Sequence, residues 1–200
     1  MKNDDQYKKP VGYIGLILHK GGEWNSETQS LTSDAEIIDQ IEFKNTIVAS
    51  ASYLMAQRMA PGSAINSNVG NFIASGLQYL SVGTIVADPI NNPGDLNVMS
   101  PPLATGTESK LKYEIFRKQF TSWTFVDPST NAASNTATNI LQIVTTFQEN
   151  EAVGALTEMG IFGGNATTVK DSGIMFNYKT FAVWNKPSDA RLTVTWKLTF

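Results

Sequence analysis

The last ten residues of the chain, 191–200, constrain its fold more than any other segment. Apolar and polar side chains alternate strictly here. The apolar members are Leu192, Val194, Trp196, Leu198 and Phe200. The polar members are Arg191, Thr193, Thr195, Lys197 and Thr199. Because residues two apart point to the same face of an extended chain, the pattern predicts a half-buried β-strand with its apolar side chains turned inward. Such a strand needs partner strands and a second layer over its apolar face.

Shorter segments of the same character precede this strand. Predicted strands lie at residues 13–18, 36–43, 76–84, 111–116, 123–125, 141–147, 155–162 and 174–178. In the fourth of these, Leu111, Tyr113 and Ile115 are expected to share one apolar face. Short strands separated by turn signals such as Gly163-Gly164 indicate an antiparallel β-sandwich, with a jelly roll as the favoured variety. The predicted fold class is therefore mainly β, a jelly-roll-like antiparallel β-sandwich.

One short helix is predicted in the N-terminal half, at residues 47–59. Asn45-Thr46 offers an N-cap, and Pro61-Gly62 supplies the stop. The residues expected on one face of this helix are Ile47, Ala51, Leu54, Met55 and Met59. A face of this composition serves packing far more often than cofactor binding, so we interpret it as part of the core.

The chain is expected to form a single β-rich domain at residues 11–200, preceded by a flexible polar arm at residues 1–10. Residues 87–106 form a long irregular stretch that contains four prolines. Loops of this length are usually functional or intermolecular, so we interpret the stretch as an insertion or a contact arm. The chain has no cysteine, and a core of this size needs no disulfide.

The charge of the chain argues against two kinds of partner. A net charge of −3 and the lack of clustered Lys and Arg give no basis for binding nucleic acid. The polar N-terminus shows no signal peptide, and no apolar run approaches the roughly 20 residues that span a bilayer. We therefore expect neither nucleic acid nor a membrane as a partner, and synthesis in the cytosol.

Charged residues are also unevenly distributed. Between Lys44 and Asp88 the only one is Arg58, and between Asp127 and Glu149 there is none. Two interpretations remain open. These segments either form buried elements joined by polar loops, or they lie in subunit contacts, where charged residues are depleted.

Few residues suggest catalysis. His19 is the only histidine and is expected to be exposed or to cap a strand end. Glu149 and Glu151 are two apart, so an extended backbone would place both carboxylates on one face, as a glycoside hydrolase requires. Their setting favours a solvated turn instead. We predict no catalytic, cofactor-binding or metal-binding residue, no cofactor, and no enzyme activity.

The acidic and amide residues of the proline-rich stretch match no calcium loop and are interpreted as a turn. This set is Asp88, Asn91, Asn92 and Asp95.

Three residues are singled out as contacts or structural sites. Trp24, in a polar loop, and Trp184, before Asn185, are candidate contacts for a glycan or a protein partner. Trp123 and Trp196 fall on apolar strand faces and are expected in the core. Glu158 lies within an apolar strand and is predicted to be a buried structural carboxylate. Its expected ion-pair partners are Arg117, Lys118 and Arg191.

The part of the chain from residue 76 to 200 resembles a known class of proteins. The segments that carry the resemblance are residues 79–84, 111–118, 124–127, 146–154, 157–164 and 192–196. Leu111, Glu114, Ile115 and Arg117 fit an L-x-x-E-I-x-R pattern, and a strand of E-x-G-L-F type follows at Glu158. This pattern is similar to that of tailed-bacteriophage structural proteins of the tail-fibre, collar and baseplate-appendage kind. The chain departs from true fibres because it has neither a collagen-like run nor a heptad repeat.

The resemblance implies a non-enzymatic structural component of a tailed-phage virion, made in the host bacterial cytoplasm. It would be a tail, collar or neck, or baseplate-associated fibre or adaptor subunit. The implied partners are copies of the chain and other virion structural proteins, joined through apolar areas and strand edges. Alternatives are a capsid decoration protein, a host-glycan-binding module of the tail, and a glycan hydrolase that uses Glu149 and Glu151.

Overall fold

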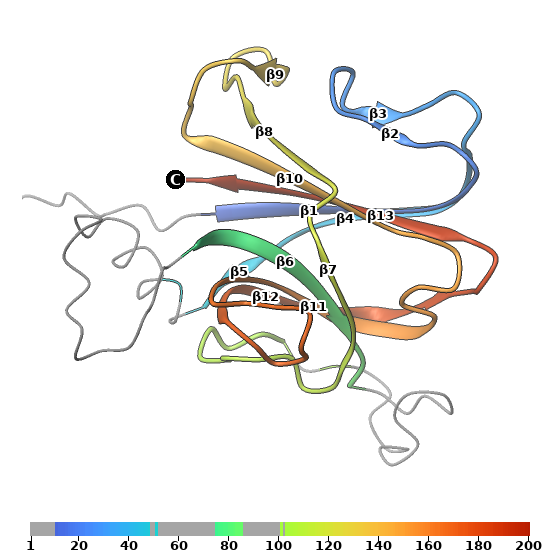
Figure 1. The fold of residues 1–200 in the computed structure, drawn as a ribbon, viewed down its shortest axis with the longest axis vertical. Coiled ribbons are helices and arrows are strands. Elements are labelled where there is room, and N and C mark those ends of the chain that lie inside the picture. The colour runs from blue at the N-terminus through green and yellow to red at the C-terminus, as the bar shows by residue number, and fades with distance from the viewer. Residues whose placement is uncertain (1–10, 49–50, 52–74, 86–100, 102) are drawn as a thin grey trace, which may run out of the picture.

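The fold consists of two antiparallel β-sheets that pack face to face (Figure 1). It is seen in a computed structural model that describes residues 11–48, 51, 75–85, 101 and 103–200. The predicted mainly β, antiparallel sandwich is confirmed. In strand order, the six-stranded sheet contains β4 (Glu36–Lys44), β1 (Val11–Lys20), β13 (Arg191–Thr199), β10 (Ile140–Phe147), β8 (Ser122–Val126) and β9 (Ala133–Ser134). The five-stranded sheet contains β5 (Thr46–Ile47), β12 (Ile174–Lys186), β11 (Gly154–Gly164), β6 (Ser75–Gly83) and β7 (Glu114–Gln119).

The order of the strands follows from hairpins that stay within one sheet. The pairs β1–β4 and β8–β10 belong to the six-stranded sheet, and β6–β7 and β11–β12 belong to the five-stranded sheet. The last strand, β13, pairs with β1 on one side and with β10 on the other. β13 therefore joins the β1–β4 pair to the β8–β10 pair. Because it has a strand on each side along its length, its apolar and polar residues can alternate without interruption.

The core lies between the two sheets. On β13, Leu192, Val194, Trp196 and Leu198 are at most 1% exposed, as the alternation predicts. They belong to one cluster with side chains of both sheets, such as Ile14, Leu16, Met159, Ile161 and Phe176. Burying a large apolar side chain contributes about 1.5–3 kcal/mol, so this cluster is the main source of stability.

The alternation fails at two positions of the 191–200 segment and at two positions of the 111–116 segment. Phe200 is 49% exposed, and Thr193 is fully buried although its position predicts a solvent-facing side chain. In the 111–116 segment, Tyr113 is 43% exposed whereas Glu114 is buried. The predicted apolar face of that segment is therefore wrong at Tyr113.

The predicted helix is not confirmed. Ile47, its expected first residue, lies in β5, where it pairs with Asn177 of β12. Val48 and Ala51 are buried, and the Ala51 N–H donates to the Val48 carbonyl at 3.0 Å. The rest of residues 47–59, the arm at 1–10 and most of the stretch at 87–106 lie outside the described residues. Within the described part of the chain, no helix is long and apolar enough to cross a membrane.

A third element lies on the outer face of the six-stranded sheet. The chain leaves β1 at Gly21-Gly22, both with positive φ (58° and 67°), and forms the ribbon of β2 (Trp24–Asn25) and β3 (Ser30–Leu31) before it enters β4. Figure 1 shows the ribbon at the upper right, separate from both sheets. The register between β1 and β4 shifts between Leu18 and His19, which leaves Ile38 as an extra residue on β4. This shift is a β-bulge.

Candidate functional site

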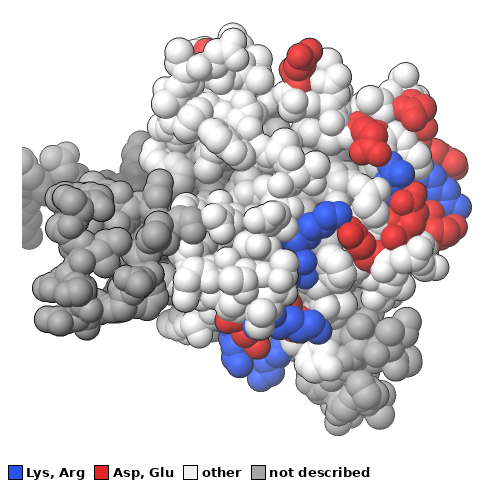
Figure 2. Space-filling model, in the orientation of Figure 1, with Lys and Arg blue, Asp and Glu red and all other residues white. Residues whose placement is uncertain are grey.

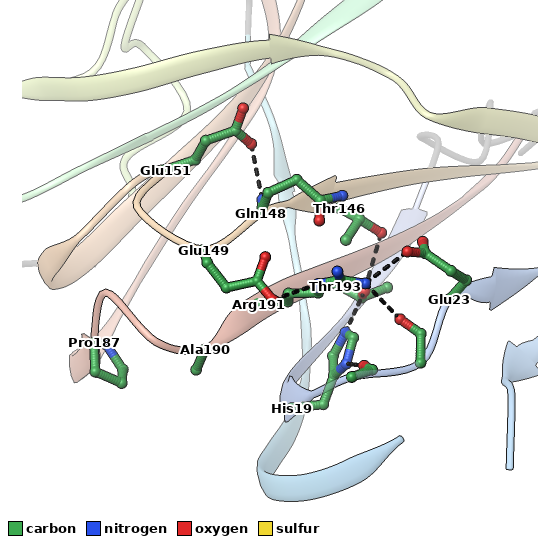
Figure 3. Close-up of polar contacts among 12 residues, drawn as sticks. His19, Glu23, Thr146, Gln148, Glu149, Glu151, Pro187, Ala190, Arg191 and Thr193 are labelled. Atoms are coloured by element: carbon green, nitrogen blue, oxygen red, sulfur yellow. Dashed lines mark hydrogen bonds and ion pairs between the residues drawn. The ribbon is translucent and has the colours of Figure 1, made fainter. Parts of the chain in front are cut away.

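The start of the ribbon is fixed by two buried or partly buried side chains (Figure 3). His19 is fully buried. Its Nδ1 lies 2.6 Å from the Gly21 carbonyl, and its Nε2 lies 2.9 Å from the Thr193 hydroxyl. Because a carbonyl only accepts, Nδ1 carries a proton and donates it to Gly21. The expected exposed position is therefore wrong, and the alternative role of capping the strand end fits.

Thr193 continues this network across the sheet. Its hydroxyl lies 3.0 Å from the Thr146 hydroxyl, so hydrogen bonds connect β1, β13 and β10. This explains why Thr193 is buried, since its polar atom has partners on both sides. A buried polar group with such partners is tolerated at little cost.

Arg191, at the start of β13, holds the ribbon from the other side. Its Nη1 donates to the Gly22 carbonyl at 2.9 Å and to the Glu23 carboxylate at 2.6 Å. Its Nε donates to Glu149 at 2.9 Å. Figure 3 shows these side chains converging on the guanidinium. Arg191 and His19 therefore fix the turn from which the ribbon folds back over the sheet.

The Glu149 and Glu151 carboxylates are engaged by different cations. Glu149 turns toward Arg191, whereas Glu151 accepts hydrogen bonds from the Lys118 ammonium at 2.5 Å and from the Gln148 backbone N–H at 2.8 Å. A hydrogen bond from its own backbone N–H, aided by Arg191, lowers the pKa of Glu149. A general acid needs a raised pKa. The lowered pKa of Glu149 does not suit it as a general acid, and both carboxylates have structural partners.

A groove opens between the ribbon and the outer face of the six-stranded sheet. It has a volume of about 610 Å³, within the range of small-molecule sites. The side chains that matter most for its chemistry are Trp24 and Gln29 of the ribbon, Thr195 of β13, and Gln40 and Glu42 of β4. The floor includes Gly15, where an added Cβ would lie 2.6 Å from the Thr195 Oγ1, so a side chain at this position would crowd the floor.

A second hollow adjoins the groove. It has a volume of about 140 Å³ and is lined by Tyr13 and Lys197 together with Gly15, Glu42 and Thr195, which line the groove as well. The two hollows thus lie next to each other, and each is lined by one aromatic residue, Trp24 or Tyr13. Tyr13 is 41% exposed.

Gln29 is the most unusual residue of the groove. Both polar atoms of its side-chain amide are shielded from solvent and have no hydrogen-bond partner among the described residues. Leaving a buried polar group without a partner costs about 1–3 kcal/mol. Its backbone is also left-handed, with φ of 56°, a conformation that non-glycine residues rarely adopt. No pattern in the sequence marks this residue.

The structure separates the two tryptophans proposed as contacts. Trp24 lines the groove. Trp184, on β12, packs against the main core cluster, and its Nε1–H donates to the Asp39 carboxylate at 2.5 Å. Trp184 therefore joins β12 to β4 and is not part of the groove.

Glu158 is fully buried on β11, as predicted. Its carboxylate accepts hydrogen bonds from the backbone N–H groups of Lys112 (2.9 Å) and Tyr113 (2.7 Å) and from the Tyr178 hydroxyl (2.6 Å). Burial raises the pKa of Glu158, and the hydrogen bonds oppose this shift. Burial also raises the pKa of Tyr178, so Tyr178 stays protonated and donates.

The expected ion pair of Glu158 is not formed among the described residues. Arg117 pairs instead with Glu114, through Nε at 2.8 Å and Nη2 at 2.9 Å, and Lys118 and Arg191 pair with the glutamates described above. Both side chains of the Arg117–Glu114 pair are 1% exposed. A two-point contact of this kind meets the geometric demands of a buried ion pair.

The end of the six-stranded sheet formed by β8, β9 and the residues that connect them differs from the groove. From residue 119 to 148, the only charged residue is Asp127. Figure 2 shows the same contrast on one face of the molecule, since charged side chains gather near the start of β13 and around β7, and few lie over β8–β10.

Trp123, at the β8–β9 end, is 62% exposed, so its predicted place in the core is wrong. It stands opposite Ile143, which in turn stands opposite Trp196, so all three belong to the core-facing side of the sheet. Trp196 is 1% exposed. The five-stranded sheet covers Trp196 and leaves Trp123 open. The Trp123 ring packs edge-to-face on Phe125, with centroids 5.8 Å apart.

Neither a metal centre nor a relative offers a further lead. Among residues 11–48, 51, 75–85, 101 and 103–200, no group of three or more His, Cys, Asp or Glu side chains could hold a metal ion. Comparison with known proteins finds no family model that matches the chain and no curated protein similar to it.

Proposed function

We propose that the chain is a non-enzymatic structural subunit of a tailed-phage virion, which assembles with copies of itself and with other virion proteins. The observation that carries the proposal is Trp123, a large aromatic side chain that is 62% exposed on a nearly uncharged part of the surface. Interfaces are depleted of charged residues and enriched in aromatic ones. The resemblance of residues 76–200 to tail-fibre, collar and baseplate-appendage proteins supports the virion as the place of assembly.

The contact is made by side chains and not by strand addition. Phe125 holds the Trp123 ring edge-to-face, which reduces the entropy that the ring loses on binding. The strand at this edge, β9, has only two residues and offers few free backbone groups to a partner strand. Trp123 is therefore the expected centre of the interface.

The test combines assembly in solution with location in the particle. In sedimentation velocity, we expect the wild-type chain to self-associate and Trp123→Ala to weaken association by about 2 kcal/mol, or about 30-fold. Tyr113→Ala is the matched control, because Tyr113 is an exposed aromatic residue outside the β8–β9 end. A chain that stays monomeric, or a Trp123→Ala variant that associates like the wild type, would remove the basis of the proposal.

Location is tested with a gold-labelled antibody on purified phage particles. Label at the neck, tail or baseplate supports the proposed position, and label spread over the head indicates a decoration protein instead. Particles without label contradict a virion role altogether.

A further inference from the structure

We propose that the groove beneath the β2–β3 ribbon binds a neutral oligosaccharide. This activity goes beyond assembly and uses a different part of the molecule, because the groove involves β1, β4 and β13 and not the β8–β9 end. A sugar ring has an apolar face of C–H groups and a rim of hydroxyls. It therefore requires an aromatic surface next to groups that donate and accept hydrogen bonds.

The groove supplies both. Trp24 provides the aromatic surface, and Gln29 and Gln40 provide amides that donate and accept. Thr195 adds a hydroxyl at the floor. This mixture of one aromatic side chain, amides and a hydroxyl suits a ligand with many hydroxyl groups.

Gln29 is the observation that points to a ligand. Its amide nitrogen and oxygen are shielded from solvent and lack a partner among the described residues, although the residue lines the groove. Rotation of the Gln29 side chain into the groove would let its amide oxygen accept from one sugar hydroxyl and its amide nitrogen donate to a second. The left-handed backbone at Gln29 is a strain that a binding role would explain.

The charge of the groove disfavours anionic ligands there, whereas the adjoining hollow carries Lys197. The lining of the groove contains no Lys or Arg, and Glu42 is its one charged side chain. Phosphate, nucleotide and acidic-sugar ligands need positive charge or an array of donors, and Glu42 would repel them. Glu42 can accept hydrogen bonds from sugar hydroxyls instead.

The sheet geometry also excludes a peptide strand as the ligand of the floor. The floor is made by β1 and β13, and β1 is paired on both sides, with β13 and with β4. Its backbone groups are therefore already used, whereas strand addition needs a free edge. A ligand in the groove is recognised through side chains.

The adjoining hollow indicates a ligand of more than one ring. It shares Gly15, Glu42 and Thr195 with the groove and is also lined by Lys197 and by Tyr13, an exposed aromatic residue with the Lys44 ammonium 5.8 Å from its ring centroid. A second sugar ring would stack on the face of Tyr13 that Lys44 does not cover. Gly15 lines both hollows, and a side chain at this position would narrow them, because an added Cβ would lie 2.6 Å from the Thr195 Oγ1.

The first experiment applies the full-length chain to an array of neutral and of sialylated or glucuronylated oligosaccharides. We expect binding to neutral glycans and none to the acidic ones. The neutral glycan that binds most tightly is then titrated by calorimetry into the wild type and into Trp24→Ala. We expect the affinity of Trp24→Ala to be about tenfold lower. Tyr113→Ala is the matched control and should bind like the wild type, because Tyr113 is an exposed aromatic residue that lines neither hollow. Failure to bind any neutral glycan, or unchanged affinity in Trp24→Ala, would overturn the proposal.

A second variant separates binding from folding. Gln29→Gly removes the unpartnered amide and allows a left-handed backbone without strain, so its melting temperature should rise by about 2–4 °C. Its affinity for the same neutral glycan should fall about three- to tenfold. If Gln29→Gly binds as tightly as the wild type, Gln29 is not part of a binding site and the assignment of this groove is wrong. Because assembly is tested at Trp123, either proposal can fail without the other.

Discussion

The two ends of the six-stranded sheet are built in opposite ways. At one end, β4 is a nine-residue strand that carries Glu36, Asp39 and Glu42. It exposes three isoleucines, at 46–53%, namely Ile37, Ile38 and Ile41. At the other end, β8 and β9 carry no charge, and the edge strand β9 has two residues. A long edge strand invites pairing with another chain, and charge and a bulge discourage it. β4 has both protections, whereas the β8–β9 end is protected by its short edge strand alone.

This difference indicates what each end can bind. The acidic residues and the bulge make β4 a poor edge for strand addition, so its apolar side chains are free to form a wall of the groove. The β8–β9 end has no such charges around Trp123, so a protein partner can cover it without desolvating a charged group. The expectation that partners complement strand edges is therefore replaced by a proposal of side-chain packing at β8.

The largest expected effect comes from placing a positive charge at each end in turn. Trp123→Arg should weaken self-association by about 3 kcal/mol, or more than about 100-fold, because it removes the aromatic anchor and leaves a charge in the contact. Ile38→Arg, at an exposed position on β4, should change association less than about twofold. Sedimentation velocity measures both. Equal losses of self-association in Trp123→Arg and Ile38→Arg would show that β4 and the β8–β9 end contribute equally to the contact.

A smaller effect is expected from releasing the ribbon. Arg191→Met removes the hydrogen bonds to Gly22, Glu23 and Glu149, which should lower the free energy of unfolding by about 1–2 kcal/mol and leave self-association unchanged. Lys20→Met is the control, because the pair of Lys20 with Asp189 is exposed and its loss should change the free energy of unfolding much less. Denaturant unfolding measures both. If Arg191→Met lowered association as strongly as stability, the ribbon and the β8–β9 end would be coupled.

A single lysine on β9 should have a still smaller effect. Ala133 is exposed, so Ala133→Lys should leave the fold intact and weaken association by about 1 kcal/mol, or about fivefold, through the cost of desolvating the new charge. Ser26→Lys, at an exposed position of the ribbon, should have no effect on association. If the interface lay elsewhere on the molecule, Ala133→Lys and Ser26→Lys would self-associate with the same affinity.

The smallest effect concerns one turn carboxylate at each end. Hydrogen bonds from the backbone N–H groups of Thr130 and Ser129 lower the pKa of Asp127, and the Thr32 hydroxyl lowers that of Asp34. A lowered folded pKa means that the stabilisation is present above the unfolded pKa of about 3.9 and is lost as pH falls through the folded pKa. Asp127→Asn and Asp34→Asn should therefore be slightly less stable than wild type at neutral pH.

The same reasoning predicts that each deficit shrinks on acidification. Thermal unfolding between neutral and strongly acidic pH measures the convergence with wild type. A deficit that persists at low pH would have a cause other than the charge of the carboxylate.

The regular strands could be predicted from the sequence because one physical pattern decides them. The alternation on β13 identifies Leu192, Val194, Trp196 and Leu198 as core, and the structure buries all four. Burial departs from the alternation where the β2–β3 ribbon covers the outer face of the six-stranded sheet, or where the facing five-stranded sheet ends. Thr193 is buried because hydrogen bonds from β1 and β10 meet there, and no pattern within β13 contains that information.

The candidate sites were harder to predict because they depend on contacts between distant segments. Trp24 could be singled out as a tryptophan in a polar loop, but Gln29 could not, because its unpartnered amide is defined by the surrounding fold. The burial of Glu158 was predictable from its apolar neighbours. Its partners were not, since its charge is met by two backbone N–H groups and a tyrosine and not by a cation.

The bulge on β4 has a consequence for chain length. Asp39 stands opposite Leu18 and Ile37 stands opposite His19, so Ile38 is additional to an otherwise regular ladder. Deleting Ile38 would leave every other pair opposite the same partner. A deletion in the regular part of the strand, away from the bulge, would instead shift the register on one side of it and exchange the faces there. A variant of this chain that lacks Ile38 is therefore expected to keep both faces of β4, and with them the wall of the groove.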